Sequence, residues 1–166
     1  MQFREYGKKD KNKKDMSVVK GRDLMVFKME GDSPSYTYKA FVAAMTHTLN
    51  INTEDVDVSS KDSGEWGDTI AGQTTWEITM NCQFVETDYD EMMELAINHK
   101  RIPLLFVKKK NAGDPGPMPE GGWEPDTTGG WTGEVEVRSV SVSAPHNGQA
   151  TYDVTFRGCG ALTKRT

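Results

Sequence analysis

Cysteine is scarce in this sequence. Its 166 residues include two, Cys82 and Cys159, too few for a disulfide scaffold or a Cys-rich metal site. Both lie in strand-like sequence, where we expect buried free thiols. No apolar run approaches the roughly 20 residues of a membrane helix, and no apolar stretch follows the charged N-terminus as in a secretory signal. We therefore expect one domain with a sizeable core, made in a reducing cytoplasm.

Groupings of catalytic or metal-binding side chains are also lacking. His47, His99 and His146 lie in a strand, at a helix end and in a turn, without the spacing of a zinc site. There is no Gly-x-Ser-x-Gly elbow and no phosphate-binding glycine loop. The acidic residues at 54–62 lack the register of a calcium loop. We expect no enzyme, cofactor or metal, although paired carboxylates for sugar hydrolysis stay open because their separation is three-dimensional.

Positive charge is concentrated at the N-terminus. Residues 1–15 hold six basic and three acidic side chains, a net charge of +3, and the rest of the chain carries −8. This predicts a flexible basic leader at 1–15, a solvated tail or a contact for an acidic partner, before one domain at 16–166. The acidic domain argues against a nucleic-acid groove and suits a surface that must not hold nucleic acid.

Strict alternation of apolar and polar residues marks one strand clearly. Trp76, Ile78, Met80, Cys82 and Phe84 occupy one phase. Because a strand's side chains alternate between its faces, we expect this phase to face the core and the other to face water or a lumen. The residues of that second phase, our candidates for a lumen surface, are Thr75, Glu77, Thr79, Asn81 and Gln83.

A single helix is predicted after this strand. Residues 87–90 have the Thr-x-x-acid form of a capping box, with Asp in place of Glu. Acidic residues at the start and basic residues at 99–101 favour the helix dipole, and Pro103 prevents continuation. The expected apolar stripe is Tyr89, Met92, Met93, Ala96 and Ile97.

Turn signals divide the rest of the chain into strands. We expect strands at 23–30, within 38–58, at 102–109, at 131–144 and from residue 150 on. The apolar phase switches between Val137 and Val140, which predicts a β-bulge. Polar 59–72 and the Gly/Pro-rich 111–130 are expected to be long irregular segments. Six to eight strands and one helix predict a mainly β fold, a β-sandwich or open barrel with one flanking α-helix.

Three tryptophans, Trp66, Trp123 and Trp131, lie in or beside the polar loops. Such loop aromatics stack on sugars in carbohydrate-binding modules, anchor protein interfaces, or fix their own loops to the core. All three interpretations stay open from the residues alone.

Several segments together resemble the major tail tube protein of long-tailed phages and prophages. They are residues 18–27, 41–51, 59–66 (Ser-Ser-Lys-Asp-Ser-Gly-Glu-Trp), 71–76 and the Phe-Arg-Gly-Cys-Gly-Ala-Leu of 156–162. The resemblance spans residues 16–162 and rests on the order and spacing of these segments.

This resemblance implies a structural subunit of a virion tail, made in the bacterial host. Six copies would form a ring, sheets would line a channel, and stacked rings would form a tube through which DNA passes in transit. Implied partners are the chain itself, the tape measure, the tail terminator and the baseplate or initiator, with no membrane or small-molecule substrate. Self-assembly suits long segments at 54–72 and 111–130, and we place Ser60, Lys61, Asp62 and Trp66 in an inter-subunit loop. The alternatives are a carbohydrate-binding or adhesin module, and the tube of a contractile injection device.

Overall fold

The computed structural model describes residues 18–41 and 43–166; the expected leader at 1–15 lies outside them. Within these ranges the chain forms seven strands, one α-helix and one 3₁₀ turn, which confirms the expected mainly β class with one helix. In chain order the elements are η1 (Gly21–Asp23), β1 (Leu24–Glu30), β2 (Thr37–Ala40), β3 (Ala44–Asp57), β4 (Thr69–Gln83), α1 (Glu86–Ile97), β5 (Arg101–Lys108), β6 (Trp131–Ser143) and β7 (Thr151–Lys164).

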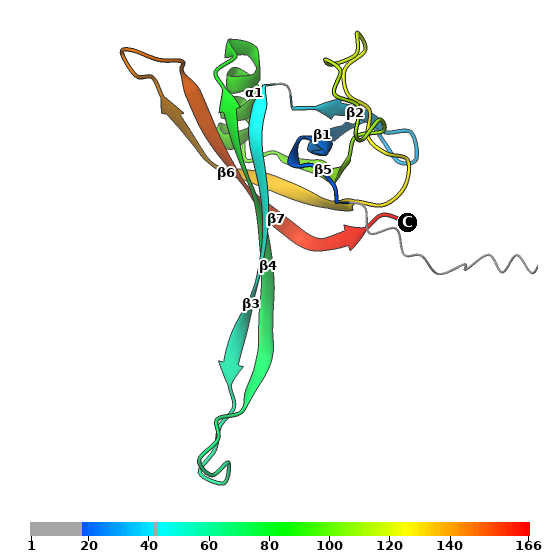
Figure 1. Cartoon of the computed structure of the whole chain (residues 1–166). Coiled ribbons are helices and arrows are strands. Elements are labelled where there is room, and N and C mark those ends of the chain that lie inside the picture. Colours follow the sequence, from blue (N-terminus) through cyan, green and yellow to red (C-terminus); the bar gives the residue numbers. More distant parts are fainter. Residues whose placement is uncertain (1–17, 42) are drawn as a thin grey trace, which may run out of the picture.

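All seven strands belong to one antiparallel sheet. Its order is β2-β1-β5-β6-β7-β4-β3, so β2 and β3 lie at the two edges. The sheet curls until β1 and β3 approach one another. The result is an open barrel, from which the far halves of β3 and β4 project as a long arm (Figure 1).

The inside of the curled sheet holds the main core. Val26 of β1, Ile78 of β4 and Val154 of β7 pack in one cluster, although three strands separate β1 from β4 in the sheet order. Helix α1 closes this cluster with Met92 and Leu95. Burying each large aliphatic side chain stabilises the fold by about 1.5–3 kcal/mol.

The predicted alternation of β4 is confirmed over its second half. Trp76, Ile78, Met80 and Cys82 are buried, with at most 5% of each exposed. The strand ends at Gln83, so Phe84 leaves the expected core phase and is 38% exposed. The other expected buried thiol, Cys159, is only half-buried on β7.

Trp76 depends on two glycines of neighbouring strands. Its indole lies flat against the backbone at Gly133 of β6 and Gly158 of β7, where a Cβ atom would overlap with the ring. Its Nε1 donates a hydrogen bond of 2.9 Å to the Gly160 carbonyl. Gly133 and Gly158 therefore leave the space that the Trp76 ring occupies.

The helix begins earlier than the sequence predicted. Its first residue is Glu86, and the N-cap is Val85, which has no side-chain hydrogen bond, so the capping box at Thr87 is wrong. The Phe84 and Tyr89 rings, 5.1 Å apart, fix the entry of the chain instead. Leu95 replaces Ile97 in the buried stripe, and Ile97 is 69% exposed.

The last two strands confirm the predicted bulge. The register between β6 and β7 shifts between Val137 and Ser139, where the apolar phase of the sequence changes. The two strands are connected through the turn that contains Asn147 and Gly148, as expected.

The polar region expected as a loop at 54–72 is strand at both of its ends. Asp55 pairs with Ala71, Val56 with Ile70 and Asp57 with Thr69. Only residues 58–68 lie between β3 and β4, so the predicted loop is the tip of a ribbon. Cross-strand hydrogen bonds form here without an apolar face, a pairing that local sequence does not reveal.

Candidate assembly surfaces

The arm, defined here as residues 52–74, has no core of its own. Every one of these residues is described, and none is buried. Large apolar side chains nevertheless occur on it: Val56 is 44% exposed, Val58 42%, Ile70 55% and Trp66 85%. An isolated two-stranded ribbon is at best marginally stable in water. These exposed side chains are the features expected of a surface that another molecule covers.

The tip of the arm is held by its own hydrogen bonds. The Ser59 amide donates to Asp57 (2.8 Å), the Asp68 amide donates to Ser59 Oγ (2.9 Å) and the Ser60 amide donates to Ser63 Oγ (2.9 Å). The hydrogen bonds from Ser59 lower the pKa of the Asp57 carboxyl. The tip is therefore a pre-organised turn rather than a loose loop, which lowers the entropy lost on docking.

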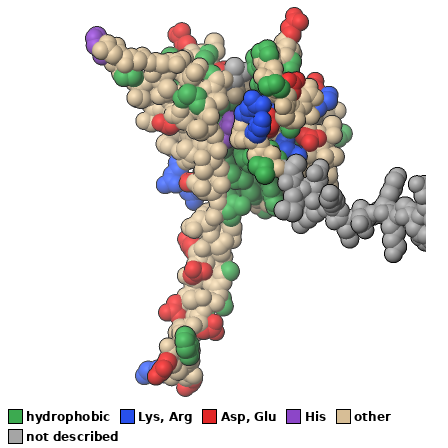
Figure 2. Space-filling view, viewed as in Figure 1, with side chains coloured by type: hydrophobic (Ala, Val, Ile, Leu, Met, Phe, Trp, Pro, Cys, Tyr) green, Lys and Arg blue, Asp and Glu red, His purple; other side chains and the backbone are tan. Residues whose placement is uncertain are grey.

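The four residues expected in an inter-subunit loop all lie in this tip. Ser60, Lys61, Asp62 and Trp66 are exposed and close together in the chain. Figure 2 shows acidic side chains along the arm and a hydrophobic group near its end. The arm carries six acidic residues and one lysine, a net charge of −5. The sequence reasoning missed the exposed pair Val56 and Ile70, whose signal was two apolar residues isolated in a polar segment.

The five candidate lumen residues lie on the opposite face of β4 from the core. All are half-buried, and they belong to a polar surface that extends over β3, β4, β7 and β6. On β3, the cross-strand neighbours of Glu77, Thr79 and Asn81 are Asn50, Thr48 and Thr46. On β7, the cross-strand neighbours of Glu77, Thr79, Asn81 and Gln83 are Arg157, Thr155, Asp153 and Thr151.

Most side chains of this polar face are uncharged, and some of its polar groups contact one another. Asn81 Nδ2 donates a hydrogen bond of 2.7 Å to Asp153. Glu77 lies opposite Arg157 across the strand pair, and His99 Nδ1 lies 3.1 Å from Glu136. A surface of short hydroxyl and amide groups makes weak, replaceable contacts with a passing solute.

The Gly/Pro-rich segment at 111–130 is irregular, as expected, and it packs on the body. It covers a second apolar cluster on the outer face of β1 and β5, formed by Met25, Phe27, Ala40, Leu105 and Val107 with Trp123 against it. The Lys110 amide donates to the Glu124 carbonyl at 2.9 Å. Trp123 therefore fixes its own loop to the core, one of the three open interpretations.

A buried ion pair holds this segment in place. Asp23 and Lys109 are 2% and 3% exposed, and Lys109 Nζ lies 3.3 Å from Asp23 Oδ1. The same ammonium lies 4.1 Å from the centre of the Trp123 ring, and the Gly113 amide donates to Asp23 Oδ2 at 3.0 Å. Buried charges of this kind require a partner, which the sequence pattern did not indicate.

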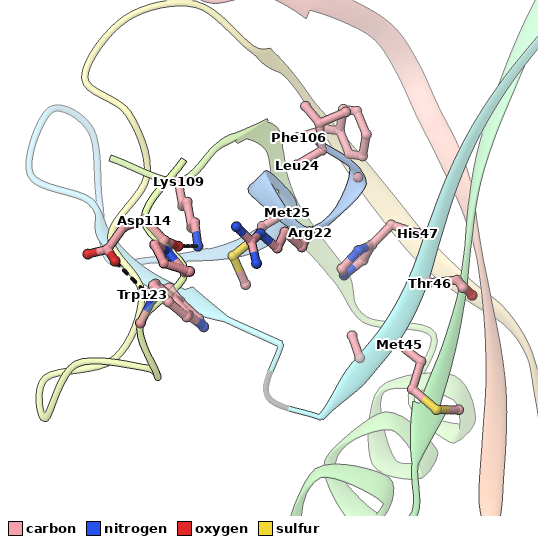
Figure 3. Close-up of a pocket in the computed structure, with 14 residues that line it drawn as sticks. Arg22, Leu24, Met25, Met45, Thr46, His47, Phe106, Lys109, Asp114 and Trp123 are labelled. Atoms are coloured by element: carbon pink, nitrogen blue, oxygen red, sulfur yellow. Dashed lines mark hydrogen bonds between the residues drawn. The ribbon is translucent and has the colours of Figure 1, made fainter. Parts of the chain in front are cut away.

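A groove of about 500 Å³ lies between η1, the near end of β3 and this segment. Its walls include Arg22, Met25, Met45, His47, Phe106 and Trp123. Figure 3 shows His47 pointing from β3 towards Arg22 and Met25. The Nε2 atom of His47 is buried without a hydrogen-bond partner among the described residues, and burial lowers the pKa of this imidazole.

Sites for metal or membrane are not found in the part of the chain that the structure describes. No group of three or more His, Cys, Asp or Glu side chains is placed to hold a metal ion. Of the helical residues described, none belong to a helix long and apolar enough to cross a membrane.

A family model described as phage tail tube protein matches residues 18–164. The chain belongs to the phage tail tube protein family. This match confirms the resemblance and the tail tube function predicted from the sequence, and it decides between that function and a carbohydrate-binding module. No match was found among curated proteins.

Solved tail and tube structures share the fold of this tail tube protein. The tail of an empty gene transfer agent particle, computed with C6 symmetry, has a TM-score of 0.65 at 21% identity, over 90% of this chain and 100% of that chain. The SPP1 tail tube gives 0.64 at 13% identity, over 89% and 79%. The PVC sheath–tube complex of a contractile injection system gives 0.57 at 12% identity, over 92% and 94%. These likenesses confirm the fold class.

Proposed function

We propose that copies of this tail tube protein form six-fold rings that stack into a hollow tube. The observation that carries the proposal is the arm, which exposes Val56, Trp66 and Ile70 without any core to pack on. Burying them against another copy would recover apolar area that the single chain leaves in water. The C6 symmetry of the gene transfer agent tail, whose fold this chain shares, supports six copies in a ring.

The polar face of β4 and its neighbours lines the channel in this proposal. Thr75, Glu77, Thr79, Asn81 and Gln83 face away from the core, and five such side chains per copy would give a ring of polar groups. Outside residues 1–15 the chain carries −8, which keeps passing DNA from adhering to the wall. The face also holds Arg138 and Arg157 beside Glu77, so the repulsion of DNA rests on the overall negative charge and not on an absence of cations.

The arm tip is the inter-subunit contact in this proposal. Ser60, Lys61, Asp62 and Trp66 would reach a neighbouring subunit or ring, with Trp66 as the anchor because it is the most exposed large apolar side chain of the arm. We expect Trp66→Ala to fold like the unmodified chain but to form tubes poorly. Normal tube formation by this variant would remove Trp66 from the contact.

The ring proposal is tested by negative-stain electron microscopy of the concentrated protein, paired with its mass in solution. Rings or hollow tubes with six-fold end views are the expected result. A monomer at every concentration, even with a tail initiator complex added, would contradict self-assembly.

Further parts of the proposal follow from the tail location. The tape measure, a tail terminator and a baseplate or initiator are the other partners, consistent with tube assemblies among the structural neighbours that include a terminator and a cap. The chain would be made in the host cytoplasm and work without catalysis. Residues 16–166 would form its single assembling domain, preceded by the basic leader at 1–15.

A further inference from the structure

The arm and the groove lined by Arg22 and His47 lie at opposite ends of β3. His47 is in the groove and Val56 is on the arm, nine residues apart on one strand. At 3.3 Å per residue this separation is about 30 Å. The arm points away from the body (Figure 1), so it cannot fold back into its own groove. Only a second molecule can bring an arm to this groove.

The groove and the arm match in chemistry. The arm has a net charge of −5 and exposes Trp66, whereas the groove presents the Arg22 guanidinium beside Met25, Phe106 and Trp123. Lys109 also lines the groove but is paired with the buried Asp23, and Asp114 is the lining carboxylate. Arg22 keeps about half of its side chain exposed, 47%, although it lies near Asp23. Apolar walls with a few polar groups are typical of sites that bind a large aromatic side chain.

We propose that the arm tip of one copy docks in the groove between η1, β3 and the 111–130 segment of a copy in the next ring. Trp66 enters beside Met25 and Phe106, and the acidic residues of the arm face Arg22. His47 Nε2, which lacks a partner among the described residues, gains one from the tip, whose hydroxyls and backbone groups are exposed.

Docking of each arm in a groove of the next ring allows rings to stack without limit. A contact between two different surfaces at opposite ends of a molecule leaves one arm and one groove free after each addition, so it propagates along an axis rather than closing on itself. The docking explains why the 111–130 segment is already fixed to the body by the Asp23–Lys109 pair: it forms one wall of the groove before a neighbour arrives.

The alternative occupant is residues 1–17, since Gly21 borders the groove. The charge of +3 on residues 1–15 makes them a poor match, because the exposed Arg22 would repel them. The acidic arm has the complementary charge.

The inference rests on the proposed tube function, so the test is made within assembled tubes. Two full-length chains with Cys159→Ser and tags of different mass are mixed, one with Glu65→Cys, which keeps Trp66, and one with Met45→Cys, and treated with a short bis-maleimide. Met45 is in the groove and 49% exposed; Met118, 46% exposed and outside it, gives the matched control Met118→Cys. We expect roughly ten-fold more mixed dimer with Met45→Cys, because docking raises the local thiol concentration.

Equal yields from the two partners in well-formed tubes would overturn the groove assignment and leave the tube function intact. If the yield of mixed dimer with Met45→Cys exceeds that with Met118→Cys only after deletion of residues 1–17, the groove is assigned to that segment instead. Failure of the unmodified chain to form rings or tubes would overturn both proposals.

A charge exchange provides a second, independent measurement. Arg22→Glu should keep its circular dichroism spectrum and lose stacking, and Glu65→Lys in the same chain should restore it. Normal stacking by Arg22→Glu alone would overturn the inference.

Discussion

Strands β3 and β4 each pass through two surroundings, the body and the arm. In the body, β4 alternates between buried residues such as Ile78 and half-buried polar ones such as Thr79. In the arm the same strand has both faces in water, and Ile70 is 55% exposed. The pairing of β3 with β4 extends from the body into the arm, with a register shift between Thr53 and Asp55 at the base of the arm.

The comparison separates two demands on one chain. Residues of the body satisfy folding, because their burial stabilises the single copy. Residues of the arm have no core to pack on, and in our proposal their apolar side chains serve assembly. Negative charge is also concentrated in the arm, which has a net charge of −5.

The strongest test of this difference between body and arm is an isoleucine-to-alanine substitution in each half of β4. Ile78→Ala removes a side chain that is 1% exposed, and we expect it to lower the free energy of unfolding by about 4 kcal/mol. Ile70→Ala should change the same quantity by less than about 0.5 kcal/mol, yet weaken tube formation. Urea unfolding of unassembled protein measures the first effect. Equal destabilisation by the two variants would show that the arm belongs to the folding unit.

Substitution of one glycine in the body and one in the arm should give the next largest difference in stability. Gly158→Ala places a methyl group against the Trp76 indole, and we expect a loss of about 3 kcal/mol from the displaced ring. Gly67→Ala in the arm tip is the control, because its Cβ would meet Ser59 Oγ at 3.4 Å, an ordinary contact. Thermal unfolding compares the two. A Gly158→Ala variant as stable as the control would mean that Trp76 has room to move.

The 111–130 segment tests whether a loop-like region belongs to the body. Asp23→Asn leaves the Lys109 ammonium buried without its counter-charge, and we expect destabilisation by about 2 kcal/mol. The loss is smaller than for a fully broken buried pair because Lys109 keeps the Trp123 ring and the Asp114 carbonyl. Hydrogen exchange of the Lys110 and Asp126 amides should also become faster. Unchanged exchange would indicate that apolar packing alone holds the segment.

Local pattern was sufficient for part of this architecture. The alternation at 76–82 predicted one buried and one polar face, and the phase change between Val137 and Val140 predicted the bulge. Both signals lie within a few residues, so a single sequence contains them. The tip residues Lys61, Asp62 and Trp66 were also placed together, because they are neighbours in the chain.

The features that the sequence did not reveal all depend on distant partners. Residues 69–71 were expected in an irregular polar segment, and only pairing with 55–57 makes them strand. The helix starts at Glu86 because aromatic rings pack around Phe84, not because of a cap. Asp23 and Lys109 are far apart in the sequence, and nothing in either neighbourhood indicates a buried ion pair. The groove combines residues from three such separate segments and was not predicted at all.

The smallest expected effect is chemical and leaves stability unchanged. Burial raises the pKa of the Cys82 thiol in the body to about 11, with the nearby carboxylates of Asp88 and Asp153 adding to the shift. Roughly one such thiol in a thousand is then ionised at pH 8, and the thiolate is the species that reacts.

We therefore expect iodoacetamide to leave Cys82 unmodified in the folded chain. A thiol placed in the arm by Trp66→Cys should react completely, because Trp66 is 85% exposed. Peptide mass spectrometry with and without denaturant measures both sites in one sample. Since a higher pH ionises more of the buried thiol, any residual labelling of Cys82 should rise towards pH 10. Labelling of Cys82 as fast as the arm thiol at pH 8 would mean that β4 opens in the body as well, and the division between body and arm would then be wrong.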